Sequence, residues 1–232
     1  MYDLPAYGLA NTITGFATLF AGCACLLLSR ALGPQPAPWR FAYWTVVVTG
    51  VFTVTLHGFG ETNPVWGERW LWAFLDTGSN IVVAWAIAMA VVADFETGAR
   101  ARRRRLLLSL AMLVGVAWHF VDRLPGTERR YLVPLGDWGG FYPGESWLIA
   151  LSLTVVVLFV AHRDRIPADA KPLLWATCGI FLVGMLLATA RNDVVVWPFL
   201  AFHALWHLVS AFGFVALWAF NHRRFAAPAG AP

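Results

Sequence analysis

Charged side chains are scarce in this sequence. Asp, Glu, Lys and Arg together make up 13% of the 232 residues and hydrophobic residues 59%, whereas soluble domains carry roughly 25% charged residues. The composition therefore excludes an ordinary soluble domain and predicts an integral membrane protein. The only lysine, Lys171, lies at the edge of an apolar run. A retinal protein is thereby excluded, because its Schiff base requires a lysine inside a membrane span.

Cysteines and basic N-terminal residues are also few. Cys23, Cys25 and Cys178 all lie within apolar runs. That placement is typical of small buried side chains and indicates neither a disulfide framework nor a metal site. The first apolar run follows Asp3 and has no basic leader, so the sequence predicts no cleavable signal peptide.

Most of the sequence consists of long apolar runs. A helix needs roughly 20 residues to cross a hydrocarbon core of ~30 Å. The sequence predicts a single all-α domain, 1–232, that forms a bundle of seven transmembrane helices. The predicted spans are 8–29, 40–60, 70–94, 105–122, 146–162, 172–190 and 197–220. The connection at about 123–145 is rich in Gly, Pro and aromatic residues, and its length predicts that it covers or lines something.

Basic residues are unevenly distributed between the two sides of these spans. Of the 17 Lys and Arg residues, twelve fall on the side of the C-terminus and five on the other side. The positive-inside rule then predicts an outer N-terminus and a cytoplasmic C-terminus, in a bacterial inner (plasma) membrane. The arginines at 102–105 are interpreted as an orientation anchor. The expected partner is therefore the lipid bilayer and not nucleic acid.

Ionisable side chains within membrane spans are costly and often functional. Asp76 is the only acidic residue well inside a predicted span. Four histidines, His57, His119, His203 and His207, also lie within spans and away from the basic ends. With the predicted orientation, all five residues fall in the outer half of the membrane. The sequence therefore predicts a site that faces the non-cytoplasmic side.

The spacing of these residues predicts a metal site. His203 and His207 lie at i and i+4 on one helix face and can chelate one divalent metal ion. His57 supplies a third nitrogen and leaves a fourth position open, as in catalytic zinc sites. Asp76 can offset the charge or accept a proton, and Thr53, four residues before His57, can donate a hydrogen bond to an oxyanion. We therefore expect Zn²⁺ on the three histidines, with Asp76 and Thr53 as catalytic residues.

Three other polar residues have alternative interpretations. Ser79 and Asn80 follow Asp76 at i+3 and i+4, so they either donate to the same oxyanion or stabilise the helix. His119 is interpreted as a hydrogen-bonding group between helices.

The motif residues resemble the CREST superfamily of seven-span membrane hydrolases, which includes alkaline ceramidases and the progestin and adiponectin receptors. That family carries Ser-x-x-x-His in span two, an Asp in span three and His-x-x-x-His in span seven. Here these motifs are Thr53-x-x-x-His57, Asp76 and His203-x-x-x-His207. The segment at 203–208 and the predicted outer N-terminus are similar to those of alkaline ceramidases. The resemblance implies zinc-dependent hydrolysis of a lipid amide or ester, with a sphingolipid-like amide as the leading substrate.

Other functions fit part of the pattern. A zincin protease is disfavoured because Ala204 stands where His-Glu-x-x-His has its glutamate. A haem-binding membrane protein is an alternative, although two histidines on one helix face cannot occupy opposite sides of one haem. Another alternative is a non-catalytic receptor or transporter with structural zinc, which requires a closed site with Asp76 or His119 as fourth ligand.

Overall fold

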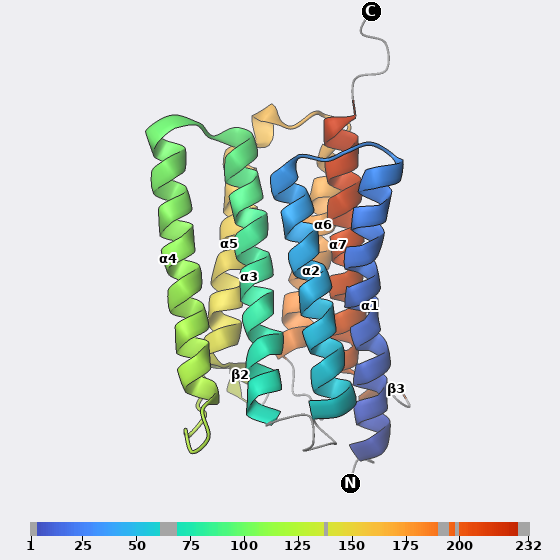
Figure 1. Cartoon of the computed structure of the whole chain (residues 1–232), viewed down its shortest axis with the longest axis vertical. Coiled ribbons are helices and arrows are strands. Elements are labelled where there is room, and N and C mark those ends of the chain that lie inside the picture. Colours follow the sequence, from blue (N-terminus) through green and yellow to red (C-terminus); the bar gives the residue numbers. More distant parts are fainter. Residues whose placement is uncertain (1–3, 61–68, 137–138, 190–194, 198–199, 227–232) are drawn as a thin grey trace, which may run out of the picture.

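The computed structural model describes residues 4–60, 69–136, 139–189, 195–197 and 200–226 (Figure 1). Within these ranges, seven helices are long and apolar enough to cross a membrane. They are α1 (Leu4–Ala31), α2 (Ala37–Thr55), α3 (Arg69–Phe95), α4 (Gly98–Arg123), α5 (Pro143–Ala161), α6 (Lys171–Thr189) and α7 (Phe202–Phe225). The prediction of an all-α, seven-helix membrane bundle is confirmed.

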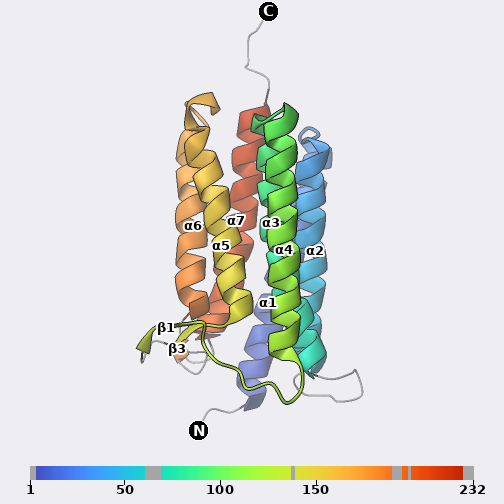
Figure 2. The same cartoon turned by 90° about the vertical axis from the view of Figure 1, so that its left-hand side faces the viewer.

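Short elements lie between the long helices. A π-helical turn, η1 (Leu56–Gly60), continues α2, and a 3-10 turn, η4 (Arg163–Arg165), follows α5. Strands β1 (Val133–Pro134) and β2 (Gly140–Phe141) pair in antiparallel fashion between α4 and α5. A second antiparallel pair, β3 (Val195–Trp197) and β4 (Leu200–Ala201), precedes α7. Both pairs lie at the end of the bundle where α1 begins (Figure 2).

The starts of five helices lie within four residues of the predicted ones, and those of α4 and α7 differ by five residues or more. α4 starts at Gly98 and not near residue 105, because alanine and arginine favour helix and the arginines extend beyond the apolar part. α7 starts at Phe202 and not at residue 197, because Trp197 lies in β3 and Leu200 and Ala201 lie in β4, where the backbone is extended. The later start places His203 in the first turn of α7.

The helix neighbours determine which spans can share a site. α1 packs against α2 and α7, and α3 packs against α2, α4 and α5. Among the seven spans, that of α3 is the most buried, at 61%. Gly22 of α1 and Gly50 of α2 allow close approach, because a Cβ at either position would collide with the backbone of Val47 or Leu19. These contacts bring the end of α2, the start of α7 and the first half of α1 together.

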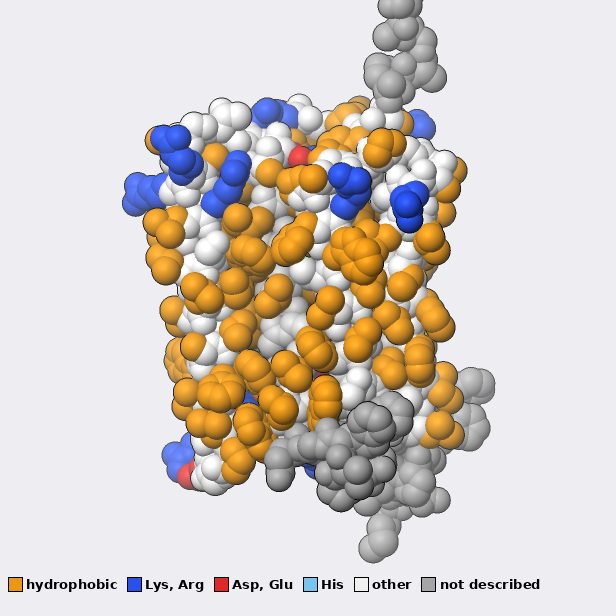
Figure 3. Space-filling view, in the orientation of Figure 1, with side chains coloured by type: hydrophobic (Ala, Val, Ile, Leu, Met, Phe, Trp, Pro, Cys, Tyr) orange, Lys and Arg blue, Asp and Glu red, His pale blue; other side chains and the backbone are white. Residues whose placement is uncertain are grey.

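The outer surface is suited to lipid. Hydrophobic side chains cover most of the face of the bundle seen in Figure 3, and Lys and Arg gather on that face at the end that carries the C-terminus. At this end a buried network holds α7. The Nη2 of Arg224 and the Nε1 of Trp39 each donate to Oδ2 of Asp94 at 2.6 Å, and Asn221 donates to the hydroxyl of Tyr43 at 3.1 Å. One end of α7 is thus fixed against α2 and α3, while the other end carries its two histidines.

Candidate metal centre

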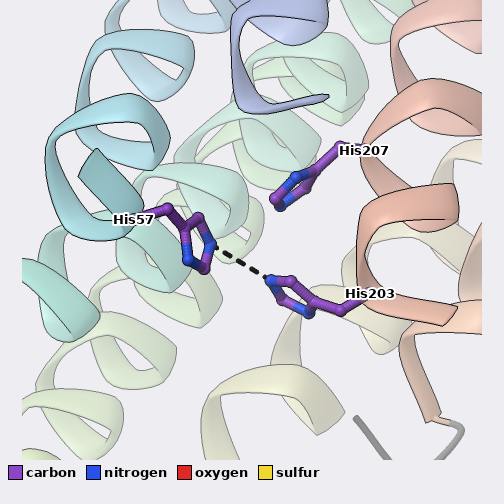
Figure 4. A group of neighbouring side chains, drawn as sticks. All are labelled: His57, His203 and His207. Carbon is purple, nitrogen blue, oxygen red and sulfur yellow. Dashed lines mark hydrogen bonds between the residues drawn. The ribbon is translucent and has the colours of Figure 1, made fainter. Parts of the chain in front are cut away.

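Three imidazoles converge between α2 and α7. His57 lies in η1, directly after α2, and His203 and His207 lie on the first two turns of α7 (Figure 4). The Nε2 atoms of His57 and His203 are 3.2 Å apart, and one nitrogen from each of the three rings lies within 4.8 Å of the others. His57 and His207 are buried. The prediction that these three residues form one group is confirmed.

Local structure explains this convergence. His203 and His207 project from the same face of α7 because four residues make little more than one helical turn. His57 reaches them from the π-helical turn at Leu56–Gly60, an irregularity that often accompanies functional sites. Trp206 packs against both α7 histidines, with its ring centroid 5.3 Å from that of His203 and 5.2 Å from that of His207. The π-helical turn and the contacts with the indole place the three imidazoles close together.

One pair of nitrogens has the spacing expected for two ligands of a tetrahedral metal ion. Nitrogen ligands at about 2.0–2.1 Å from zinc lie about 3.3–3.4 Å from each other when the angle is tetrahedral. The 3.2 Å separation of the His57 and His203 Nε2 atoms is close to this value. Within the described residues the group contains three ligands and no carboxylate or thiolate. The three imidazole nitrogens could therefore hold one metal ion.

The predicted catalytic pair is assembled one helical turn from His57. The hydroxyl of Thr53 on α2 donates a hydrogen bond to Oδ1 of Asp76 on α3. Both side chains are buried, with 2% and 4% of their surface exposed. A carboxylate accepts hydrogen bonds only, so the single Thr53 proton is committed to Asp76. In this geometry Thr53 orients the carboxylate, and its hydroxyl is not free to serve an oxyanion.

The other polar candidates have structural contacts. The side chains of Ser79 and Asn80 both donate to the backbone carbonyl of Asp76, at 2.8 and 3.0 Å. His119 is fully buried, stacks on Phe74 of α3 and fills the space beside Gly144, where a Cβ would collide with its Nδ1. His119 is not a member of the three-histidine group found among the described residues. These contacts agree with the structural interpretations of Ser79 and Asn80. His119 packs between helices, but neither of its ring nitrogens has a hydrogen-bond partner among the described residues, so the structure does not show the hydrogen-bonding role expected for it.

Sequence reasoning missed the contribution of α1. Thr14 is buried, and its Oγ1 lies 3.1 Å from Nδ1 of His207. A signal was present, because Asn11, Thr14 and Thr18 lie at i, i+3 and i+7 in an apolar run and all three are buried. Such a polar face inside a membrane span indicates contacts with another polar group.

Comparisons with protein-family models, characterised proteins and solved structures found no match. The resemblance to the seven-span hydrolases therefore stays a hypothesis, carried by Thr53, His57, Asp76, His203 and His207.

Proposed function

We propose that this protein is a zinc-dependent hydrolase that cleaves amides or esters of lipids within the membrane. The observation that carries the proposal is the convergence of three imidazoles within 4.8 Å, one helical turn from the hydrogen-bonded Thr53 and Asp76. Three imidazole nitrogens and a buried carboxylate are groups that occur in catalytic zinc sites, where the metal would act as a Lewis acid on the carbonyl and make water more acidic.

Asp76 would handle the protons of the reaction. Hydrolysis forms a bond between the water oxygen and the acyl carbon and breaks the bond from that carbon to nitrogen or oxygen. The carboxylate accepts the proton that leaves the attacking water and returns it to the leaving nitrogen or oxygen. The hydroxyl of Thr53 holds Oδ1 of Asp76 in place during this transfer. The products are a free fatty acid and an amine or an alcohol.

An apolar cavity supports a lipid substrate. A cavity of about 330 Å³ lies between α3, α5, α6 and α7, lined mainly by aliphatic and aromatic residues. Trp206 lines this cavity and also contacts His203 and His207, which are not among the lining residues, so its indole lies against both the cavity and the metal centre. A volume of this size suits an aliphatic chain. By the resemblance, a ceramide-like amide is the leading substrate.

Hydrolysis by purified protein in lipid nanodiscs tests the proposal. We expect zinc-loaded protein to release fatty acid from an N-acyl sphingoid lipid or from an acyl ester. Chelation should abolish release, and added Zn²⁺ but not Mg²⁺ should restore it. If zinc-loaded protein cleaves neither substrate, the hydrolase proposal is wrong. Bound zinc without turnover would favour a receptor or transporter with structural zinc, whereas a Soret band would indicate haem.

We further propose that the metal centre lies in the outer half of the membrane. The histidines lie at the end of the bundle where α1 begins, opposite the end rich in Lys and Arg. Glu128, between α4 and β1, and Asp164, in η4, lie at opposite ends and have 75% and 91% exposed side chains. We expect a membrane-impermeant maleimide to label Glu128→Cys only from the non-cytoplasmic side and Asp164→Cys only from the cytoplasmic side. Both variants are made with the three native cysteines replaced by alanine, and the reverse labelling pattern would contradict the orientation.

A further inference from the structure

We propose that Thr14 of α1 is a positioning residue of the metal centre, which holds His207 in the tautomer whose Nε2 lone pair can bind the metal. The inference rests on the proposed metal binding. It adds α1, a helix outside the three motifs, to the site.

The hydrogen bonds of Thr14 determine the tautomer. Its hydroxyl has one proton, and the backbone carbonyls of Ala10 and Asn11 lie 2.8 and 3.3 Å from Oγ1. A carbonyl only accepts hydrogen bonds, so the proton goes to the backbone, preferentially to the nearer carbonyl of Ala10. The contact between Oγ1 and Nδ1 of His207, at 3.1 Å, then requires the imidazole to donate. His207 therefore carries its proton on Nδ1 and has a bare Nε2.

A second observation agrees with this assignment. Nε2 of His207 is buried and has no hydrogen-bond partner among the residues that the structure describes. A proton on Nε2 would thus be a buried donor without an acceptor, which is unfavourable. A bare Nε2 in a ring whose centroid lies 5.2 and 4.7 Å from those of His57 and His203 is instead a ready metal ligand.

Burial makes Thr14 difficult to replace. The exposed fractions of Thr14 and His207 are 5% and 2%, so bulk water cannot supply a substitute acceptor for the Nδ1 proton. Without the hydroxyl, the imidazole can rotate or move its proton to Nε2, and either change removes a ligand. Groups that orient metal-binding histidines in this way typically contribute 10- to 100-fold in metal affinity.

Zinc affinity of purified variants tests the inference, measured by competition with a chromophoric chelator. Thr14→Val keeps the shape and removes the hydroxyl, so we expect zinc to bind roughly 10- to 100-fold more weakly. Thr14→Ser keeps the hydroxyl that accepts the hydrogen bond, so this variant should bind zinc with nearly the wild-type affinity. The absorption spectrum of the Co²⁺-substituted protein should change in Thr14→Val and recover in Thr14→Ser, because it reports the ligand geometry directly.

Thr12→Val is the matched control. Thr12 lies on the same helix and its hydroxyl also donates to the carbonyl four residues earlier, that of Gly8, at 2.8 Å. This variant loses the same intrahelical bond, so its zinc affinity should stay at the wild-type value. If Thr14→Val binds zinc as tightly as the wild type, with an unchanged Co²⁺ spectrum, the inference is wrong and the proposed function stands. If the wild type binds no metal, both are wrong. Should the valine variant fail to fold, Thr14→Ala gives the same comparison with a smaller side chain.

Discussion

Replacing Asp76 with asparagine is expected to leave zinc bound and to lower turnover of lipid substrate by on the order of 10²-fold or more, the usual scale for general base catalysis. Asparagine has nearly the same size, and its carbonyl oxygen can still accept the hydrogen bond from Thr53. It cannot accept the proton from water. Steady-state rates and zinc content measured on the same preparation separate these two effects.

Thr53 provides the companion test of the same pair. Thr53→Ser keeps the hydroxyl and should retain most of the activity. Thr53→Val removes the hydrogen bond to Asp76 and should cost on the order of 10²-fold, because a misplaced catalytic group loses about that much. Zinc should stay bound in both variants. If Asp76→Asn cleaves lipid amides and esters as fast as the wild type, the hydrolytic mechanism is wrong.

Replacing either α7 histidine with alanine is expected to remove the metal. The wild type should contain about one equivalent of zinc, and His203→Ala or His207→Ala should contain a small fraction of that, because a three-ligand site with one ligand removed is left with two. Elemental analysis of protein purified without chelator measures the difference. Added zinc should also raise the melting temperature of the wild type and leave both variants unchanged, because a ligand that binds only the folded state stabilises it.

His119→Ala is the matched control for these variants. His119 is another buried histidine of the same half of the bundle, and it packs against Phe74 and beside Gly144. Its removal should lower the stability of the bundle and leave about one equivalent of zinc in the folded protein. Loss of zinc from His119→Ala together with retention in His207→Ala would contradict the assignment of the ligands.

The sequence determined the features that depend on hydrophobicity and on distance along one helix. Seven long apolar runs were sufficient to predict seven membrane helices, because each must satisfy its own backbone within lipid. The spacing of His203 and His207 set them on one face, since helical geometry fixes the relation of i to i+4. The depth of His57 followed from counting residues along its span, and its grouping with the α7 histidines is observed in the structure.

Features that depend on the rotation of each helix and on its neighbours required the tertiary structure. Asp76 and Thr53 share a depth, but only the packing of α2 against α3 decided that the hydroxyl donates to the carboxylate. His119 shares that depth as well, yet its side chain packs against Phe74 of α3 and beside Gly144 of α5. Thr14 reaches His207 because α1 packs against α7. The apolar pattern of a span fixes where it crosses the membrane, but lipid and protein neighbours are equally apolar, so the pattern does not fix which helix lies beside it.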